Sequence, residues 1–285
     1  MNLAVLFGLL NMLTMGVSNS MSRPPIKILG EDRFMVLRTI LTTAFLTILF
    51  VFNTKSANFI FLQILFAIGL AVICYFALIL MYNSFSIGKL GVVAPITGAY
   101  TLISIILTLL FFHTKIETNQ IIGICIITAS IFLGSANFKD FDKSDFLNKK
   151  TGIPQAVGCF LLWGAFFFLA QIPTKALGPY LAALCFEIGI LLCSLIRLVF
   201  IKDKSLKIEK KAFYFITLIA FISVVGTALF YYGINNFNPA IILALSGATP
   251  LVATIYGLVV YKEKLTTKQL LASLSIIGGI ILLSI

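Results

Sequence analysis

Long apolar runs recur ten times along this sequence of 285 residues. An α-helix rises 1.5 Å per residue, so about 20 apolar residues are needed to cross a hydrocarbon core about 30 Å thick. The runs are continuous and not alternating, which favours helices over a β-barrel, because an open sheet edge in lipid would leave backbone groups unpaired. The sequence therefore predicts an all-α integral membrane protein with ten transmembrane helices, near residues 3–21, 34–52, 59–82, 88–112, 119–137, 153–174, 179–201, 211–233, 239–261 and 267–285.

The composition supports this interpretation. Hydrophobic residues make up 60% of the chain and charged residues 11%, which leaves too little polar surface to cover a water-soluble globule. The first run lacks a basic segment before it and is interrupted by Asn11 and Asn19. We therefore expect it to be a membrane helix and not a cleaved signal peptide.

The breaks between the runs are spaced as in a duplicated chain. Adding 149 to the connectors 22–33, 53–58, 83–88 and 113–118 gives the breaks 171–182, 202–207, 232–237 and 262–267 without a gap. We predict a first repeat at 1–137, a linker at 138–152 and a second repeat at 153–285. Five helices per repeat is an odd number, so the second repeat must be inverted relative to the first. Inverted repeats are typical of secondary transporters that work by alternating access.

Basic residues predict the orientation of the chain. Connectors one, three, five, seven and nine carry 16 Lys and Arg residues, whereas the other connectors carry 3. The positive-inside rule then places the basic connectors in the cytoplasm and both termini outside, in a cell (inner) membrane. We attribute the net charge of +11 to a basic cytoplasmic surface near the lipid, and we expect no nucleic-acid partner.

The chain resembles the drug/metabolite transporter superfamily, specifically its ten-helix EamA-type members. The resemblance is carried by the paired five-helix halves and by three segments: LLWGAFF, which opens the second half, and VVAPITGAYTLISIILTLLFFHTKIETNQIIG and LALSGATPLVATIYGLVVYKEKLTTKQLLASLSIIGGIILL, which end the two halves. In the family such ends hold a Pro-containing helix, an acidic break and a small-residue helix. Glu263 fits the acidic position, whereas Thr114 replaces it in the first half, and Thr14 stands where the second half has Trp163. The resemblance implies a transporter, although many relatives look to have cytoplasmic termini.

Polar side chains inside the spans are candidates for lining a cavity, because the membrane disfavours them elsewhere. An amide cannot satisfy all its groups on its own helix, so it needs a partner, a water or a substrate. The alternatives are a Ser or Thr bonded to its own helix and a Tyr anchored at the interface. The predicted substrate-binding residues are Asn11, Thr14, Asn19, Arg38, Tyr75, Thr97, Tyr100, Trp163, Gln171, Tyr231, Ser246 and Thr249.

Two charged residues in the spans have functional interpretations. Arg38 could bind a substrate carboxylate or phosphate through its planar fork, or extend to the interface. Glu187 lies roughly 13 Å deep by helical rise, and we assign it as the coupling residue, with protons as the coupling ion. The alternatives for Glu187 are a neutral acid bonded to a neighbour or a charged acid reaching a wet vestibule.

The chemistry of these side chains bounds the substrate. The small multidrug members of the superfamily have an essential Glu in the first helix, and none occurs here in the first or sixth run, which disfavours export of cationic drugs. Amides, hydroxyls and aromatics, with one acid and one base at separate depths, suit a neutral or zwitterionic metabolite such as an amino acid. Pro95 and Pro250 are candidate hinges, with a static kink as the alternative.

Signals of an enzyme or a metal site are weak. His113 is the only histidine, the five cysteines lie inside apolar runs without metal-ligand spacing, and no glycine-rich phosphate loop occurs. We therefore expect no catalytic residue, metal or cofactor. Small-residue faces at Gly278 and Gly279 predict close helix contact within the fold or across a homodimer. The predicted function is a secondary transporter that exports a small polar metabolite. The alternative is a flippase of a lipid-linked or amphipathic substrate with the same fold.

Overall fold

A computed structural model describes residues 3–88, 90–114, 116–135, 149–200, 208–262 and 267–284. Within these ranges the regular structure is helical. The predicted linker 138–152 lies outside the described residues except for its last four, and Glu263 also lies outside them. For Pro95 only the backbone is described.

Helices of the two halves match under the predicted offset. Adding 149 to the bounds of α4, α5 and α7 gives the bounds of α11, α12 and α14. The first half contains α1 (Leu3–Met21), α2 (Arg23–Leu29), α3 (Glu31–Val51), α4 (Phe61–Ile87), α5 (Leu90–Gly98), α6 (Tyr100–Phe112) and α7 (Thr118–Ser135). The second contains α8 (Ile153–Leu169), α9 (Gln171–Leu177), α10 (Pro179–Phe200), α11 (Lys210–Asn236), α12 (Pro239–Gly247), α13 (Thr249–Val260) and α14 (Thr267–Ser284). Short 3-10 turns lie at Thr54–Ser56 and Lys149–Thr151.

Helix length and composition identify an integral membrane protein. Large apolar side chains such as Phe52, Phe61 and Phe200 are exposed on the outside of the bundle, as lipid contact requires. Among the described residues, Ile96–Phe112, Thr118–Ile131 and Leu270–Leu283 form shorter apolar helices, so the count of ten crossings stays a prediction. Seven segments are long and apolar enough to cross a membrane: Leu3–Leu29, Glu31–Val51, Phe61–Ile87, Ile153–Leu177, Pro179–Phe200, Lys210–Asn236 and Pro239–Val260.

Three predicted runs are broken helices, and one predicted connector contains a helix. The breaks lie at Ala99 in the run 88–112, at Ala170 in the run 153–174 and at Ala248 in the run 239–261. The connector 22–33 contains α2. The breaks at Ala99 and Ala248 are 149 residues apart. Pro250 is the second residue of α13, where its missing N–H is tolerated and where it disfavours continuation from α12. The breaks therefore lie at the alanines and not at the two prolines proposed as hinges.

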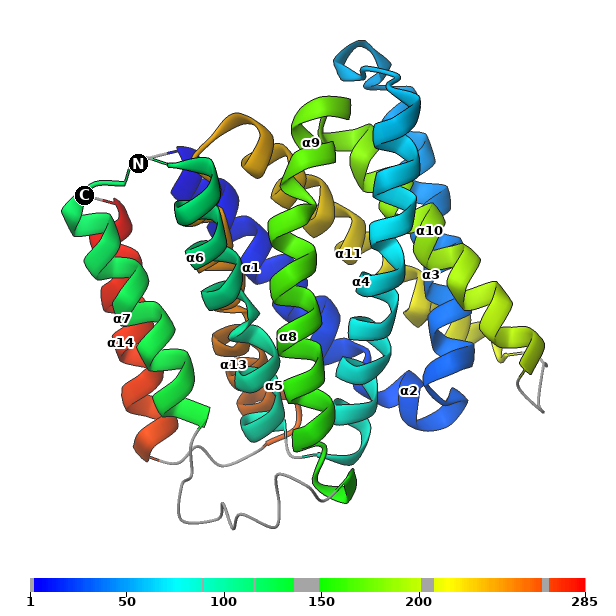
Figure 1. Cartoon of the computed structure of the whole chain (residues 1–285). Helices are drawn as coiled ribbons and strands as arrows, with labels where there is room; N and C mark the ends of the chain where they lie inside the picture. The colour runs from blue at the N-terminus through cyan, green and yellow to red at the C-terminus, as the bar shows by residue number, and fades with distance from the viewer. Residues whose placement is uncertain are drawn as a thin grey trace.

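The two halves interlock through their first helices. α1 packs against α11, α12 and α13, and α8 packs in the equivalent way against α4, α5 and α6. Figure 1 shows α1 running downward from the N-terminus and α8 running upward to α9, so these equivalent helices point in opposite directions. The start of α1 and the end of α14 lie at the same end of the bundle (Figure 1).

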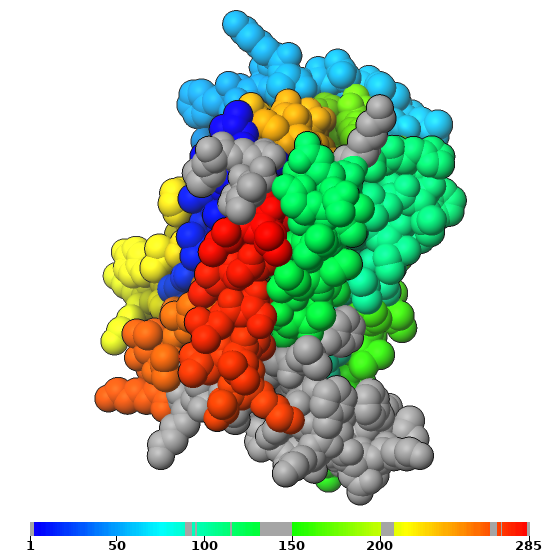
Figure 2. All heavy atoms as spheres, turned by 90° about the vertical axis from the view of Figure 1, so that its left-hand side faces the viewer, coloured from blue at the N-terminus to red at the C-terminus, as the bar shows by residue number. Residues whose placement is uncertain are grey.

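The last helices of the halves, α7 and α14, lie side by side at the left of the bundle in Figure 1 and run down the face shown in Figure 2. A Cβ added to Gly123 would lie 2.9 Å from the carbonyl oxygen of Gly279, so small residues permit this close packing. Gly278 instead faces open space, with no atom within 4 Å of an added Cβ. At least part of the small-residue surface is therefore used within the fold, and the homodimer stays a prediction.

Candidate substrate-binding site

A polar cavity of about 100 Å³ lies between the two halves, with room for several water molecules. Both halves contribute to its wall, which is formed by residues of α1, α3, α4 and α6 from the first half and of α8, α10, α11, α12 and α13 from the second. Glu187 is among the lining residues. Eight of the twelve predicted substrate-binding residues line it as well: Asn11, Asn19, Arg38, Tyr100, Trp163, Tyr231, Ser246 and Thr249.

Aromatic rings form much of the cavity wall. Tyr100 stacks on Phe167 with ring centroids 4.6 Å apart and meets the edge of Trp163 at 5.3 Å. Phe186 and Tyr231 stack with centroids 5.3 Å apart. The Tyr100 contacts join rings of the two halves, whereas Phe186 and Tyr231 both belong to the second half, and such pairs are stabilised beyond their apolar burial.

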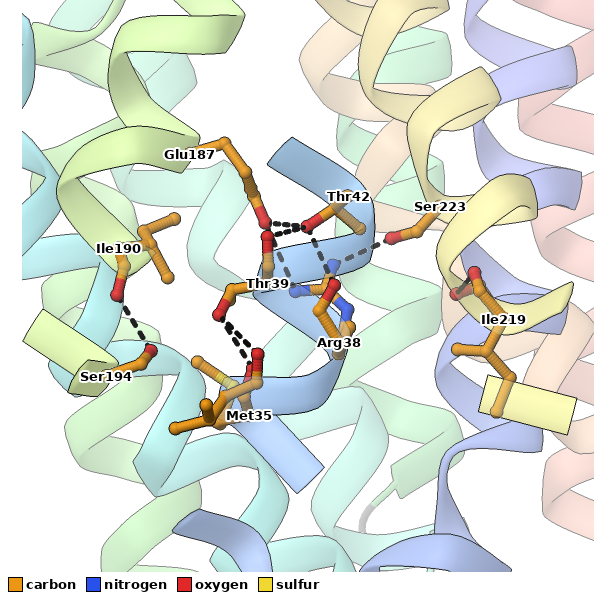
Figure 3. A network of polar contacts seen from close by, with 11 residues as sticks. Met35, Arg38, Thr39, Thr42, Glu187, Ile190, Ser194, Ile219 and Ser223 are labelled. Atoms are coloured by element: carbon orange, nitrogen blue, oxygen red, sulfur yellow. Dashed lines mark hydrogen bonds and ion pairs between the residues drawn. The ribbon is translucent and has the colours of Figure 1, made fainter. Parts of the chain in front are cut away.

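One base and one acid face each other in the cavity. Arg38 on α3 and Glu187 on α10 are 6% and 7% exposed, and Nη1 of Arg38 lies 3.9 Å from Oε1 of Glu187. Nη2 of Arg38 donates a hydrogen bond to Oγ of Ser223 at 2.7 Å, and the hydroxyl of Thr42 donates to Oε1 of Glu187 (Figure 3). The expectation of an acid and a base at separate depths is therefore wrong. α3 begins at Glu31, earlier than the predicted run, so Arg38 lies seven residues after the start of the helix and not near its end.

The acid and the base occupy equivalent positions in the two halves. Glu187 lies 149 residues after Arg38, which is the offset that relates the helices of the two halves. Because α3 packs against α10, these equivalent positions meet face to face. The offset could have revealed this pairing in the sequence, but the opposite charges give no residue match.

Two buried donors that line the cavity lack an acceptor. Among the described residues, Nη1 of Arg38 and Nε1 of Trp163 have no hydrogen-bond partner. The polar neighbour of Trp163 is the thiol of Cys74, which is only a weak acceptor. An unsatisfied buried donor costs about 1–3 kcal/mol, so an acceptor entering the cavity would be stabilised at both positions.

Asn11 connects three helices beside the cavity. Its Nδ2 donates to the carbonyl oxygen of Gly226 on α11 at 2.9 Å, and its Oδ1 accepts from the hydroxyl of Ser246 on α12 at 2.6 Å. The amide on α1 therefore already has protein partners on both of its ends. A structural role accounts for Asn11, and its role as a substrate ligand stays a prediction.

Four predicted residues do not line the main cavity. Thr14 donates to the carbonyl oxygen of Leu10 at 2.7 Å, which is the alternative considered for a threonine in a span. Gln171 is fully buried and joins α9 to α6, because its Nε2 donates to Oγ1 of Thr108 at 2.7 Å. Tyr75 is buried outside the cavity lining, and Thr97 lines an adjoining cavity of about 20 Å³. Their assignment as substrate ligands stays a prediction.

Aromatic residues at the ends of α6 and α13 connect the halves at opposite ends of the bundle. At the end of α13, Oη of Tyr261 donates to the carbonyl oxygen of Ser20 at 3.0 Å, and the Arg23 guanidinium lies 5.6 Å from the Tyr261 ring centroid. At the end of α6, the Lys175 ammonium lies 5.2 Å from the Phe112 ring centroid. Phe112 and Tyr261 are 149 residues apart, so the two rings occupy equivalent positions, whereas Arg23 and Lys175 are 152 residues apart and do not.

Comparisons with known proteins identify the family. A protein of Methanocaldococcus jannaschii, described only as uncharacterized, is 34% identical over 99 residues, which is 34% of this chain and 70% of that protein. A protein of known crystal structure shares 12% identity and has a TM-score of 0.75 over 98% of this chain and 95% of its own, which shows the same fold. The EamA-like transporter family matches residues 2–136 and again residues 150–285. Since these two matches span nearly the whole sequence, the chain belongs to the EamA-like transporter family of membrane transporters.

Proposed function

We propose that the protein is a secondary carrier that moves a small polar metabolite, neutral or zwitterionic and similar to an amino acid, by alternating access. The observation that carries this proposal is a cavity lined from both halves, with Arg38 and Glu187 facing each other inside it. A base and an acid in one small cavity match a solute with both signs of charge better than a cation or an anion. The proposed direction is export across a cell membrane.

The cation–aromatic contacts at the ends of α13 and α6 support alternating access. Arg23 on Tyr261 and Lys175 on Phe112 are contacts of the same kind at opposite ends of the bundle, and their rings occupy equivalent positions. A cation over an aromatic ring stabilises by about 0.5–1 kcal/mol at exposed sites, so thermal motion can open either contact. We propose that the halves are inverted repeats and that opening one contact while the other stays closed exposes the cavity to one side.

The proposed orientation places the α2 end of the bundle in the cytoplasm. Arg23, Lys27, Lys210 and Lys268 lie on α2 or at the first turns of α11 and α14, which is the end opposite to the start of α1. Protons remain the proposed coupling ion, with Glu187 as the residue that couples.

Proteoliposomes test the proposed function. Purified protein is reconstituted with an unlabelled amino acid inside, and uptake of the same radiolabelled amino acid is followed for each member of the proteinogenic set. The proposal expects counterflow of at least one of them, saturable and absent from empty vesicles. If no member of the set shows counterflow, the amino-acid-like substrate is refuted.

A groove on the outside of the bundle favours a flippase as the second candidate. This apolar groove has a volume of about 610 Å³ between α1, α3, α10 and α11, and Phe45, Phe221 and Val224 line it. Val224 follows Ser223, the hydrogen-bond partner of Arg38, and α3 and α11 contribute to both the groove and the cavity. Phe45 and Phe221 meet edge to face across this contact, with centroids 5.8 Å apart. A lipid tail could lie in the groove while its headgroup occupies the cavity.

The two candidates differ in what Phe45→Ala does. A flippase should translocate fluorescent phospholipid in protein-containing vesicles, and the smaller side chain should speed it by opening the lateral contact. A carrier should move no lipid in either form. Translocation of lipid by the wild-type protein, without counterflow of any soluble solute, would establish the flippase and exclude the carrier.

A further inference from the structure

The Arg38–Glu187 pair determines the net charge of the cavity. Both side chains are buried. They face each other from equivalent positions on α3 and α10. A buried charge without a partner is strongly destabilising, whereas a buried pair approximately compensates itself. The empty cavity is therefore neutral because these two residues pair.

We infer that a zwitterionic solute separates this pair, its carboxylate binding Arg38 and its ammonium binding Glu187. The inference rests on the proposed function and specifies the solute class, which is a small molecule with one carboxylate, one ammonium and no net charge. The pair thus selects the solute by charge balance and returns to its own contact when the solute leaves.

Separating Arg38 from Glu187 requires little free energy. The N–O distance of 3.9 Å exceeds the 2.7–3.2 Å of an N–H···O hydrogen bond, so no hydrogen bond is lost between Arg38 and Glu187. Each charge also has its own anchor, because Arg38 donates to Ser223 and Glu187 accepts from Thr42 (Figure 3). Nη1 of Arg38 keeps no hydrogen-bond partner and can donate to a carboxylate.

The rest of the wall suits the two ends of such a solute. Nε1 of Trp163 is a second donor without a bonded acceptor, available to the other carboxylate oxygen. The stacked rings of Phe186 and Tyr231 line the same cavity and offer faces to an ammonium group. A wall with donors and aromatic rings therefore complements the separated pair.

Charge balance also predicts the transport cycle. With a zwitterion bound, Arg38 and Glu187 each have a partner of opposite charge, and without it they have each other. With Glu187 ionised, the buried charge sums to zero in both cases, so both the loaded and the empty protein can change from one open state to the other. This cycle is the alternative to proton coupling at Glu187, because a protonated Glu187 would leave Arg38 unpaired. The protein should therefore perform net transport and not only exchange. A simple anion or cation would leave one protein charge unpaired and should be excluded.

Binding is tested through Trp163, which is the only tryptophan in the sequence and lines the cavity. Its fluorescence is titrated with two matched probe sets: L-alanine, alaninol and propanoate, and L-leucine, leucinol and 4-methylpentanoate. The wild type should bind an amino acid and neither its alcohol nor its acid. Glu187→Gln should instead prefer the carboxylate, Arg38→Gln should prefer the amino alcohol, and each preference should change by about tenfold or more. Glu187→Asp, which keeps the charge, should retain the wild-type order.

Flux distinguishes charge balance from direct structural damage. In proteoliposomes, Glu187→Gln should retain counterflow of the matching carboxylate, because the loaded cavity is neutral. Its net efflux into solute-free buffer should fall about tenfold or more, because the empty cavity then holds an unpaired Arg38. Glu187→Asp, which keeps the charge, should retain the wild-type ratio of net efflux to counterflow for the amino acid.

Melting temperature tests the pair without any solute. Arg38→Gln and Glu187→Gln should each lower the melting temperature. The decrease in the double variant should be smaller than the sum of the two single decreases. Additive changes, or a Glu187→Gln protein that binds carboxylate more weakly than the wild type, would overturn the inference. If no probe binds the wild type, the proposed amino-acid-like substrate fails, and the melting temperatures alone decide whether the pair neutralises the cavity.

Discussion

Gly98→Ala tests the crossing of the two broken helices. Gly98 ends α5, and a Cβ at this position would lie 2.7 Å from Cγ of Pro250 and 3.0 Å from the carbonyl oxygen of Gly247. Neither neighbour can move easily, since one is a proline ring and the other is backbone. Overpacking of this kind costs about 1–3 kcal/mol, and the higher helix propensity of alanine returns at most about 1 kcal/mol at a helix end. We expect a net loss of about 1–2 kcal/mol.

The assay is thermal unfolding of the purified protein in detergent, followed by circular dichroism. A loss of this size should lower the melting temperature by a few degrees, on the order of 2–4 °C per kcal/mol. Gly69→Ala is the matched control, because Gly69 lies inside α4 and an added Cβ there has no atom within 4 Å. The control should be neutral or stabilising. A Gly98→Ala protein as stable as the wild type, or an equal loss in both variants, would refute the close crossing.

Three further predictions concern contacts between helices and the orientation of the chain. Asn11→Ala should lose about 1–2 kcal/mol of stability in detergent, because its two interhelical hydrogen bonds disappear, whereas Thr14→Ala, whose hydroxyl bonds its own helix, should lose almost none. Lys27 and Lys55 are exposed, and cysteines introduced there should be labelled from opposite faces of the membrane, Lys27→Cys from the cytoplasmic face. Labelling of both from one face would contradict the proposed topology. Tyr261→Phe removes the hydrogen bond to Ser20 and should weaken the contact at the α2 end by about 1 kcal/mol. Labelling of the cavity from that face should then rise about fivefold. No change in labelling would show that this contact does not limit access.

Sequence reasoning predicted the helical class and the spacing of the halves. Both depend on the lengths of the apolar runs and the positions of the breaks between them, which can be read directly from the sequence. It missed α2, since Pro24 and Pro25 indicated a connector, although proline is well tolerated in the first turn of a helix. It also missed the breaks at Ala99 and Ala248. An alanine in an apolar run carries no signal of a break by itself; Pro250 is a local signal two residues after Ala248, whereas Ala99 has no proline at the corresponding position.

The site could be predicted only as a set of residues, not as a geometry. Asn19, Tyr100 and Ser246 were selected by residue type and line the cavity, although most buried polar residues in the spans do not. Tyr75 and Gln171 were indistinguishable from them in the sequence, because a buried polar group can equally be satisfied by another helix. The contact of Arg38 with Glu187 needs the packing of α3 on α10, which no local pattern encodes.

The most direct test of the account is the accessibility of Cys74, which lines the cavity and would be the single cysteine left after the other four are replaced. A small, membrane-impermeant methanethiosulfonate reagent is added to one face of oriented proteoliposomes at a time. Alternating access predicts that Cys74 is modified from both faces and that a bound amino acid slows both reactions. Modification from one face only, with the other face unreactive under every condition, would contradict a cavity that opens to each side in turn.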